Sequence, residues 1–402
     1  MEKIVIIGAG HGGVELAVAL RQRRFAGSVT LVSDEAELPY HRPPLSKDFL
    51  KTDGTDPLRL KAESFYANNA VELKRGRRAV AIDRSARAVR LDDGEMLPYD
   101  HLALALGARN RGLPIPGADH PDILELRDLA HAREIMRRSK ALTRVAIIGG
   151  GFIGLEAAAF FREKGIAVDI VELAGRLMAR AVSPPISDYF RRFHEAMGAN
   201  IHFGAQAASI AHQDRKAVVG LKDGRKLAAD AVLIAAGIVP NTELAEDAGL
   251  PIDNGVLVDD RLLTGDPAIS ALGDCAAFPC IHGERCLRLE SVQNAVDQAR
   301  CIAKRLTGES EPYAALPWFW SNQGTARLQI AGLDAGHDTE VIRGDAENAP
   351  FSVFLYRGDR LLAVESVNNA RDHMLARKLI EARTLVPHDM AARPDADLKA
   401  LL

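Results

Sequence analysis

The chain has 402 residues, of which 47% are hydrophobic and 26% are charged, so it is long enough for two or three globular domains. Lys and Arg total 51 against 54 Asp and Glu, and the net charge of -3 gives no general attraction to nucleic acid or to an acidic membrane surface. No signal segment or long apolar run is visible, which predicts a cytoplasmic protein with no membrane and no nucleic-acid partner.

The first predicted elements are a strand, a glycine-rich turn and a helix. The sequence IVIIGAGHGG (4–13) leads into a helix and then into the strand SVTLVSD (28–34). Gly8, Gly10 and Gly13 form a GxGxxG pattern between strand and helix, which allows a tight turn, close approach of a pyrophosphate and close helix packing. The helix start adds amides and positive potential. A dinucleotide site is predicted here, with a glycine-rich turn without ligand as the alternative.

The same pattern returns later in the chain. VAIIGGGFIG (145–154) contains Gly149, Gly151 and Gly154 and leads into a second helix and the strand AVDIVEL (167–173). In both copies an Asp-Gly hairpin and an apolar strand that ends at a glycine follow. This repeat of βαβ units predicts an α/β fold with two Rossmann-like dinucleotide-binding domains.

A carboxylate is expected at the end of the second strand of each unit, where it binds the ribose hydroxyls of the bound adenosine. Asp34 or Glu35 occupies this place in the first copy, and Glu172 occupies it in the second. Since a carboxylate at Glu172 repels a 2'-phosphate, NADH is predicted over NADPH, with the nearby Arg176 acting against this preference. A solvated acid at a strand end is the alternative for each position.

The rest of the chain predicts a return to the first domain and then a third domain. DPAISALGDCAAF (266–278) indicates a strand that runs into a turn, and a helix is expected from Glu290 to Leu306. From Pro312, strand-like runs such as FSVFLYR (351–357) and a later helix predict an α+β domain. The predicted domains are 1–110 with 240–311, then 111–239, then 312–402.

Two dinucleotide folds in one chain imply that their ligands react with each other. Hydride transfer needs the nicotinamide carbon stacked on the flavin nitrogen, so one ligand is predicted to be a flavin. The unbroken first copy, with a return segment that contains Gly273 and Asp274, favours noncovalent FAD at the first site and NADH at the second.

Five motifs carry a resemblance to a known family. The motifs are LPYHRPPLSKDFL (38–50), GGGFIGLE (149–156), ISALGDCA (269–276), ESVQNA (290–295) and PWFWSNQG (317–324). They resemble the putidaredoxin reductase type of ferredoxin reductase, with rubredoxin reductase and apoptosis-inducing factor as more distant relatives, over nearly the whole chain. The resemblance implies a glutathione reductase-like architecture. It also implies an FAD enzyme that takes two electrons from NADH and hands them singly to a small acidic two-iron two-sulfur ferredoxin, which then reduces a cytochrome P-450 oxygenase.

The resemblance implies an ion pair beside the reacting atoms. Lys47 and Glu156 correspond to the family's pair next to the flavin and the nicotinamide, and a buried lysine needs such a partner. Positioning and charge control are the expected roles, because hydride transfer requires no enzymic base. Arg42, Pro43 and Pro44 are expected as a stiff wall, so the predicted catalytic group is Lys47, Pro44 and Glu156. A surface loop is the alternative for Arg42.

The resemblance places further residues against FAD. Asp274 is expected to accept from a ribitol hydroxyl, Arg127 to meet pyrophosphate charge, and the Val292 amide to stabilise charge on the reduced flavin. Trp320 shares a strand face with Trp318, and ordinary core packing is an equal alternative for both. The expected FAD contacts are Gly12, Asp34, Arg42, Lys47, Val80, Arg127, Asp274, Glu290, Val292 and Trp320.

The cysteine positions separate this chain from disulfide-reducing relatives. Those enzymes need a thiolate pair beside the flavin, and peroxide- or oxygen-reducing relatives use a single cysteine there, but residues 36–60 contain none. Cys275 and Cys280 are expected to be structural. No His or Cys spacing suggests a metal site. Electrons are therefore predicted to leave directly from flavin to an external one-electron acceptor.

Two other functions stay open. One is a flavin NADH oxidase or quinone reductase, and the other is a binding protein switched by flavin reduction, as in apoptosis-inducing factor. For a ferredoxin partner, which is generally acidic, a basic docking patch is predicted at Arg300, Lys304 and Arg305 on one helix. Scattered solvated charges are the alternative for this patch.

Overall fold

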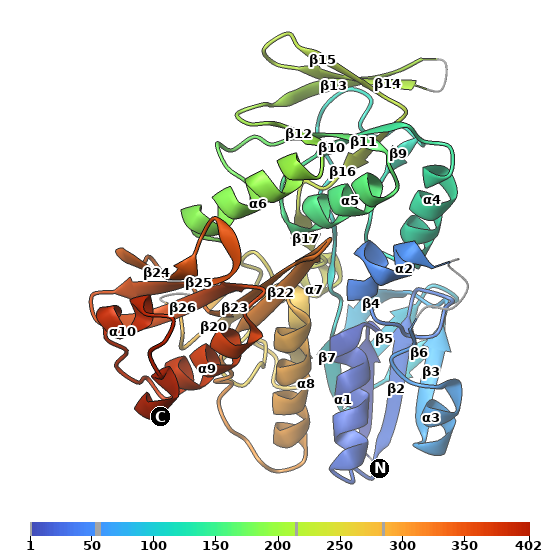
Figure 1. Cartoon of the computed structure of the whole chain (residues 1–402). Helices are drawn as coiled ribbons and strands as arrows, with labels where there is room; N and C mark the ends of the chain where they lie inside the picture. The colour runs from blue at the N-terminus through green and yellow to red at the C-terminus, as the bar shows by residue number, and fades with distance from the viewer. Residues whose placement is uncertain (1, 53–57, 214–215, 284–285) are drawn as a thin grey trace. The chain divides into compact units, whose positions relative to one another are not determined.

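The structure is a computed structural model that describes residues 2–52, 58–213, 216–283 and 286–402. It divides into two compact units (Figure 1). Unit 1 comprises Met1–His41, Leu58–Arg109 and Val239–Pro317, and unit 2 comprises Arg42–Pro57, Asn110–Ile238 and Trp318–Leu402. The three predicted domain boundaries stay a prediction.

Unit 1 is built on a five-stranded parallel sheet in the order β19-β7-β1-β2-β3. The central strand β1 (Lys3–Ile7) pairs with β2 (Ser28–Ser33) and β7 (His101–Leu104). After their first residues these strands are buried along their whole length, as expected of a parallel sheet covered on both faces. The helices α1 (His11–Gln22) and α8 (Val292–Leu306) pack against each other.

The other elements of unit 1 are short. They are β3 (Val71–Arg75), β19 (Ile269–Ala271), α3 (Glu63–Asn68), α7 (Glu243–Asp247), η2 (Gly273–Cys275), the antiparallel sheet of β4 (Ala79–Asp83), β5 (Ala88–Leu91) and β6 (Met96–Pro98), and the sheet of β18 (Val256–Leu257), β20 (Ala276–Pro279) and β21 (Cys286–Leu287). A two-stranded sheet joins β8 (Ala108–Asn110) and β17 (Ile238–Pro240).

Unit 2 contains a second parallel sheet, in the order β12-β11-β10-β16-β9. Its central strand β10 (Arg144–Ile148) pairs with β11 (Ala167–Val171) and β16 (Ala231–Ile234). The helix α5 (Phe152–Glu163) packs on β10 and β11. The other elements of this part are β9 (Ile123–Leu124), β12 (Ala199–His202), η1 (Pro43–Ser46), α2 (Asp48–Lys51), α4 (Leu129–Ser139), α6 (Pro184–Ala196), and the antiparallel sheet of β13 (Ala207–Gln213), β14 (Lys216–Leu221) and β15 (Lys226–Ala229).

The end of the chain forms an antiparallel five-stranded sheet within unit 2, in the order β22-β23-β26-β25-β24, with α9 (Ala370–Glu381) packed on β26 and β23 (Figure 1). This is the predicted α+β part. Its elements are β22 (Trp318–Gln323), β23 (Ala326–Gly332), β24 (Thr339–Asp345), β25 (Asn348–Arg357), β26 (Arg360–Val367), α9, α10 (His388–Ala392) and η3 (Leu398–Leu401).

The internal repeat extends to single hydrogen bonds. Asp100, just before β7, accepts from the Lys3 amide at 2.7 Å. Asp230, just before β16, accepts from the Arg144 amide at 3.0 Å. In each copy an aspartate therefore anchors the start of the central strand, which confirms the predicted pair of Rossmann-like folds.

Among the described helices, none combines the length and the apolar character that a bilayer crossing requires.

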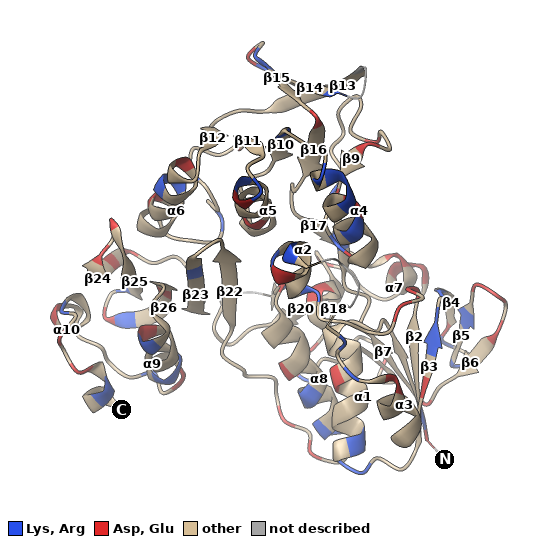
Figure 2. Ribbon diagram, turned by 45° about the vertical axis from the view of Figure 1, so that its right-hand side comes forward, with Lys and Arg blue, Asp and Glu red and all other residues tan. Residues whose placement is uncertain are grey.

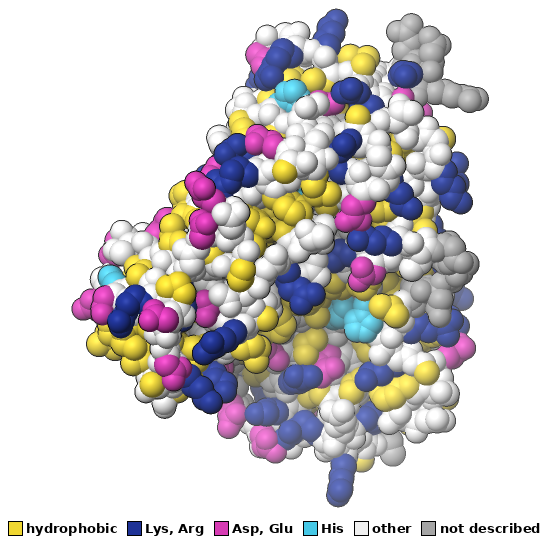
Figure 3. Space-filling model, viewed as in Figure 1, with side chains coloured by type: hydrophobic (Ala, Val, Ile, Leu, Met, Phe, Trp, Pro, Cys, Tyr) yellow, Lys and Arg dark blue, Asp and Glu magenta, His cyan; other side chains and the backbone are white. Residues whose placement is uncertain are grey.

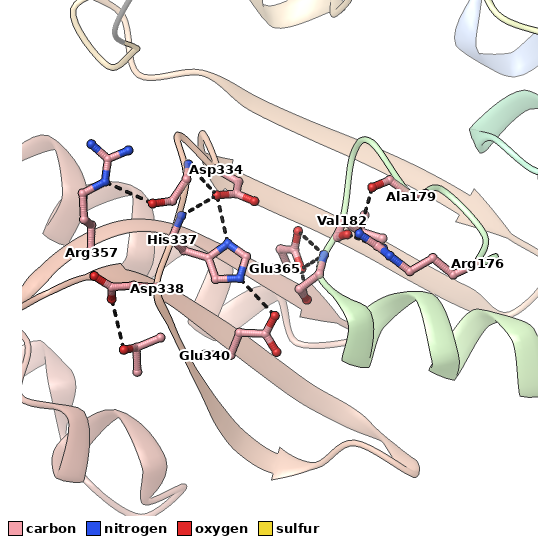
Figure 4. Close-up of polar contacts among 12 residues, drawn as sticks. Arg176, Ala179, Val182, Asp334, His337, Asp338, Glu340, Arg357 and Glu365 are labelled. Carbon is pink, nitrogen blue, oxygen red and sulfur yellow. Dashed lines mark hydrogen bonds and ion pairs between the residues drawn. The ribbon is translucent and has the colours of Figure 1, made fainter. Parts of the chain in front are cut away.

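A buried carboxylate links the C-terminal sheet to the start of α6. Glu365 on β26 accepts hydrogen bonds from the Ser183 amide, at 3.0 Å, and from the Ser183 hydroxyl (Figure 4). Burial raises the pKa of Glu365 to about 7, against the opposing effect of these hydrogen bonds, and the charges of Asp334 and Glu340 raise it further. Glu365 therefore changes charge within the physiological pH range.

The substitution Glu365→Gln is expected to stabilise the protein above pH 7 and to change little near pH 4. Because the folded-state pKa of about 7 lies above the ordinary value of 4.5, stability that is fully present below pH 4.5 is lost as the pH rises through 7. The loss amounts to at most about 3 kcal/mol. Thermal unfolding of both chains at pH 5 and pH 8 checks this, and a stability difference that is the same at both values contradicts it.

Candidate active site

The first glycine-rich turn is shaped by backbone contacts. Gly8 has φ +104°, and a Cβ there would lie 2.2 Å from the Ala105 carbonyl oxygen. A Cβ on Gly13 would lie 1.9 Å from the Gly8 carbonyl oxygen. Gly10 differs, because nothing lies within 4 Å of its added Cβ and its φ of -73° suits any residue. The fold thus requires the outer glycines, whereas Gly10 leaves open space that fits an approaching pyrophosphate.

The second turn repeats this arrangement. Gly149 has φ +115°, and its added Cβ would lie 2.3 Å from the Ala235 carbonyl oxygen, while that of Gly154 would lie 2.1 Å from the Gly149 carbonyl oxygen. Nothing lies within 4 Å of a Cβ on Gly151. Neither α1 nor α5 has an acidic residue in its first turn, so both helix starts keep the positive potential that a phosphate needs. Both turns fit a dinucleotide.

The strand-end acids differ in their surroundings. The Asp34 side chain is 63% exposed and lies 4.0 Å from Arg78, whereas Glu35 accepts from the Tyr40 hydroxyl. Asp34 is thus the more open of the two acids considered for the first ribose. Glu172 accepts from the amides of Gly150 and Ala174, both at 2.7 Å, so its carboxylate also holds the glycine-rich turn in place.

Arg176 is engaged away from a 2'-phosphate. Its guanidinium donates to the carbonyl oxygens of Ala179 and Val182, at 2.8 and 2.7 Å (Figure 4). These bonds order the loop between β11 and α6. Arg176 was the residue expected to weaken the preference for NADH. Its guanidinium already binds two carbonyl oxygens of the protein.

Replacement of Glu172 by serine is expected to narrow the preference for NADH over NADPH by about tenfold or more, because the charge that repels a 2'-phosphate is removed. The catalytic efficiency with NADH should also fall, since two amides of the turn lose their acceptor. Steady-state kinetics with both nucleotides check this. Glu195→Ser, on the surface of α6, is the control and should leave the ratio unchanged. An unchanged ratio in Glu172→Ser contradicts the assigned role.

Unit 1 contains further predicted residues of the FAD site. A Cβ on Gly12 would lie 3.1 Å from a Leu272 methyl carbon, so this glycine allows α1 to approach the return strand. Asp274 lies in η2, and Val292 is the first residue of α8, which Ser291 caps. The position of Asp274 follows the end of the parallel strand β19, as in dinucleotide sites. Glu290 pairs with Arg288 at 2.7 Å, and Val80 on β4 is 40% exposed.

Unit 2 contains the predicted ion pair. Lys47 Nζ lies 2.6 Å from Glu156 Oε2, with side-chain exposures of 14% and 2%. Lys47 also donates to the Pro43 carbonyl oxygen at 3.2 Å, so η1 holds it in place, and Pro44 follows Pro43 in the same turn. A buried ion pair of this kind is stable only with further hydrogen bonds to its free lone pairs.

Two serines supply those hydrogen bonds, and the sequence reasoning missed both. Ser46 donates to Glu156 Oε2, and Ser321 donates to Glu156 Oε1 at 2.6 Å. Both serines are buried. Two signals in the sequence could have identified these serines. A buried carboxylate needs several hydrogen-bond donors, and both serines lie inside the motifs that contain Lys47 and Trp320.

Arg42, Arg127 and the tryptophans also lie in unit 2. Arg42 donates to the Arg127 carbonyl oxygen at 3.1 Å, so the two predicted cofactor residues are neighbours. The rings of Trp318 and Trp320 are 5.4 Å apart, which confirms that they share one strand face. Trp318 also lies under the Arg377 guanidinium, 4.8 Å from its ring centre.

The predicted docking patch needs one correction. Arg305 is half-buried and donates to Ser270, so its charge is less exposed than those of Arg300 and Lys304. Arg300 pairs with Glu15 and Asp297, and Lys304 lies 3.5 Å from Glu311. Figure 2 shows Lys and Arg along α8, and Figure 3 shows charges of both signs interspersed over one face. The sequence places three cations close together on one helix. In the fold, the side chain of one of them, Arg305, packs toward Ser270.

The four cysteines are free. Cys275 is fully buried and donates weakly to the carbonyl oxygens of Leu104 and Leu272, and burial raises the pKa of its thiol to about 11. Burial also raises the pKa of Cys280. Since the thiolate is the reactive form, these values favour the structural role expected for both residues.

Among the residues that the structure describes, one group of side chains lies close enough together to be considered as a metal site. Candidate ligand atoms of His120, Asp122 and His212 lie within 4.8 Å of one another. However, the two imidazole rings are stacked at 3.8 Å with an interplanar angle of 14°. Ring nitrogens of a face-to-face pair point in parallel directions and do not converge on one ion. His212 also donates toward the Gly117 carbonyl oxygen at 3.2 Å.

Comparison with known proteins finds two matching families. Residues 2–299 match the family described as "Pyridine nucleotide-disulphide oxidoreductase", and residues 318–402 match "Reductase C-terminal". The chain is 47% identical over 398 residues to rhodocoxin reductase of Rhodococcus erythropolis, which covers 98% of this chain and 93% of that protein.

Solved structures agree with these matches. The ferredoxin reductase for the CYP199A2 system from Rhodopseudomonas palustris superimposes with a TM-score of 0.97 at 47% identity, over 100% of this chain and 99% of that chain. The covalent putidaredoxin reductase–putidaredoxin complex gives a TM-score of 0.95 at 37% identity, over 100% and 98% of the two chains.

Proposed function

Since the chain belongs to the pyridine nucleotide-disulphide oxidoreductase family, we propose that it is an NADH-dependent ferredoxin reductase with noncovalent FAD. It passes single electrons to a small acidic two-iron two-sulfur ferredoxin, which serves a cytochrome P-450 or a related oxygenase. Relatives named for rhodocoxin and putidaredoxin, and a solved complex with putidaredoxin, support this partner class.

One observation carries the proposal: two glycine-rich turns in one chain each leave open space at the middle glycine. Gly10 and Gly151 occupy equivalent places at the starts of α1 and α5. Two dinucleotides in one protein make chemical sense when one reduces the other. When bound, the flavin would accept a hydride and release electrons one at a time.

The residues of this chain bind and position the reactants. Gly8 to Gly13, Asp34 and the start of α8 hold FAD, and Gly149 to Gly154 with Glu172 hold NADH. Lys47 and Glu156 set the charge at the reacting centre. Residues 36–60 contain no cysteine, so no thiol relay stands between the flavin and the acceptor.

The test is anaerobic reduction of the purified yellow protein by NADH, followed by electron transfer to a haem reporter with and without ferredoxin. Bleaching of the flavin and a reporter signal that depends on ferredoxin support the proposal. Rapid NADH consumption under air without a protein acceptor would indicate an oxidase or quinone reductase instead. A slowly reoxidised charge-transfer complex with little ferredoxin reduction would favour a redox-switched binding protein.

Salt is expected to slow ferredoxin reduction, with a much smaller effect on reduction of a small dye, because screening weakens attraction between a basic surface and an acidic partner. We assign this surface to Arg300 and Lys304. The double variant Arg300→Gln/Lys304→Gln should lower the apparent affinity for ferredoxin about tenfold at low salt. Equal salt sensitivity with ferredoxin and dye contradicts the assignment.

A cytoplasmic location and the three-domain division belong to the same proposal.

A further inference from the structure

Glu156 is held by more than its lysine. Its Oε2 accepts from Lys47 and Ser46, and its Oε1 accepts from Ser321 on β22. Ser321 is fully buried. The C-terminal sheet therefore occupies the carboxylate oxygen that Lys47 does not use.

The hydrogen bonds continue beyond Ser321. Gln323 lies two residues further along β22, so its side chain is on the same face of the strand. Its Nε2 donates to Ser321 Oγ at 3.3 Å, and its Oε1 lies 2.8 Å from His194 Nε2 on α6. The second hydrogen on Nε2 faces Met178 Sδ at 3.7 Å. Because this sulfur is only an acceptor, the contact agrees with the assigned amide orientation.

All donors in this series of hydrogen bonds point toward Glu156. Burial lowers the pKa of His194 to about 4, with an opposing effect of the bond to Gln323, so the ring is neutral at physiological pH. The imidazole then donates to Gln323, the amide donates to Ser321, and the hydroxyl donates to Glu156. Hydrogen bonds aligned in this way polarise one another, and they do so more strongly in a low-dielectric interior.

Simple core packing does not explain this arrangement. Ser321, Gln323 and His194 each have 0% exposure. Polar groups that are removed from water cost free energy unless their bonds are made, and apolar residues of similar volume are often as stable. Within the described part of the structure, these hydrogen bonds lead to one charged group, Glu156, the partner of Lys47.

On the basis of the proposed function, we propose that Ser321, Gln323 and His194 are positioning residues for hydride transfer. They hold the Glu156 carboxylate in a single orientation. In this way they fix the Lys47 ammonium at the reacting centre without touching either cofactor themselves.

The test compares flavin reduction by NADH in rapid-mixing experiments with the FAD-loaded protein. Ser321→Ala is expected to lower the limiting rate of reduction about tenfold and to leave the NADH dissociation constant within about twofold. Ser321→Thr, which keeps the hydroxyl, should restore most of the rate. Ser366→Ala is the matched control, since Ser366 is equally buried in the same sheet and bonds to Ser352 instead.

A limiting rate in Ser321→Ala equal to that in Ser366→Ala overturns the inference, and so does a change confined to the NADH dissociation constant. If NADH does not reduce the native protein, the proposed function fails. A double-mutant cycle on thermal unfolding then still tests the hydrogen bonds that lead to Glu156. Ser321→Ala and Glu156→Gln should then be non-additive, whereas Ser366→Ala and Glu156→Gln should add. Additivity in the first pair overturns the inference.

Discussion

Gly151→Val is expected to retain yellow FAD but to lose NADH binding by more than about a hundredfold, whereas Gly10→Val should yield a folded, colourless protein. Both positions have ordinary backbone angles and open space around the added Cβ, so neither valine strains the fold. Each instead fills the volume where a pyrophosphate approaches. Flavin absorbance and anaerobic NADH titration of the two purified proteins measure these effects.

The two variants are controls for each other. A wild-type response of both variants would show that these turns do not bind dinucleotides. Gly13→Ala and Gly154→Ala give a further contrast, because their Cβ atoms would lie 1.9 and 2.1 Å from a carbonyl oxygen. These two changes should lower the unfolding temperature even without ligand, which Gly10→Val and Gly151→Val should not do.

Lys47→Met is expected to slow hydride transfer about a hundredfold, because the charge that organises the reacting centre is lost. It also leaves Glu156 buried without a cation, which costs about 3–5 kcal/mol of stability. Rapid-mixing flavin reduction and thermal unfolding measure the two effects separately.

The matched control is Lys51→Met. Lys51 pairs with Glu163 at 2.9 Å, and this pair joins the same two helical segments, but its side chains are 48% and 34% exposed. An exposed pair contributes only about 0–1 kcal/mol, so the control should change little. If both variants behave alike, burial of the Lys47–Glu156 pair has no special role.

The sequence by itself determined the repeated architecture. Hydrophobic runs, glycine spacing and Asp-Gly turns are local signals, and they predicted both Rossmann-like sheets, both glycine-rich turns and the α+β region at the end of the chain. The contacts of Gly13 and Gly154 follow from the same local geometry, because their added Cβ atoms would meet the carbonyl oxygens of Gly8 and Gly149 in the same turn.

The tertiary structure decided which polar groups meet. Glu156 is 110 positions from Ser46 and 165 positions from Ser321 in the sequence, so no periodicity links them. Arg305 shows the converse, since helical spacing suggested an exposed cation and packing turned it to Ser270. Secondary structure depends on neighbours in the sequence, whereas the hydrogen-bond partners of a buried charge depend on which strands and helices the fold brings together.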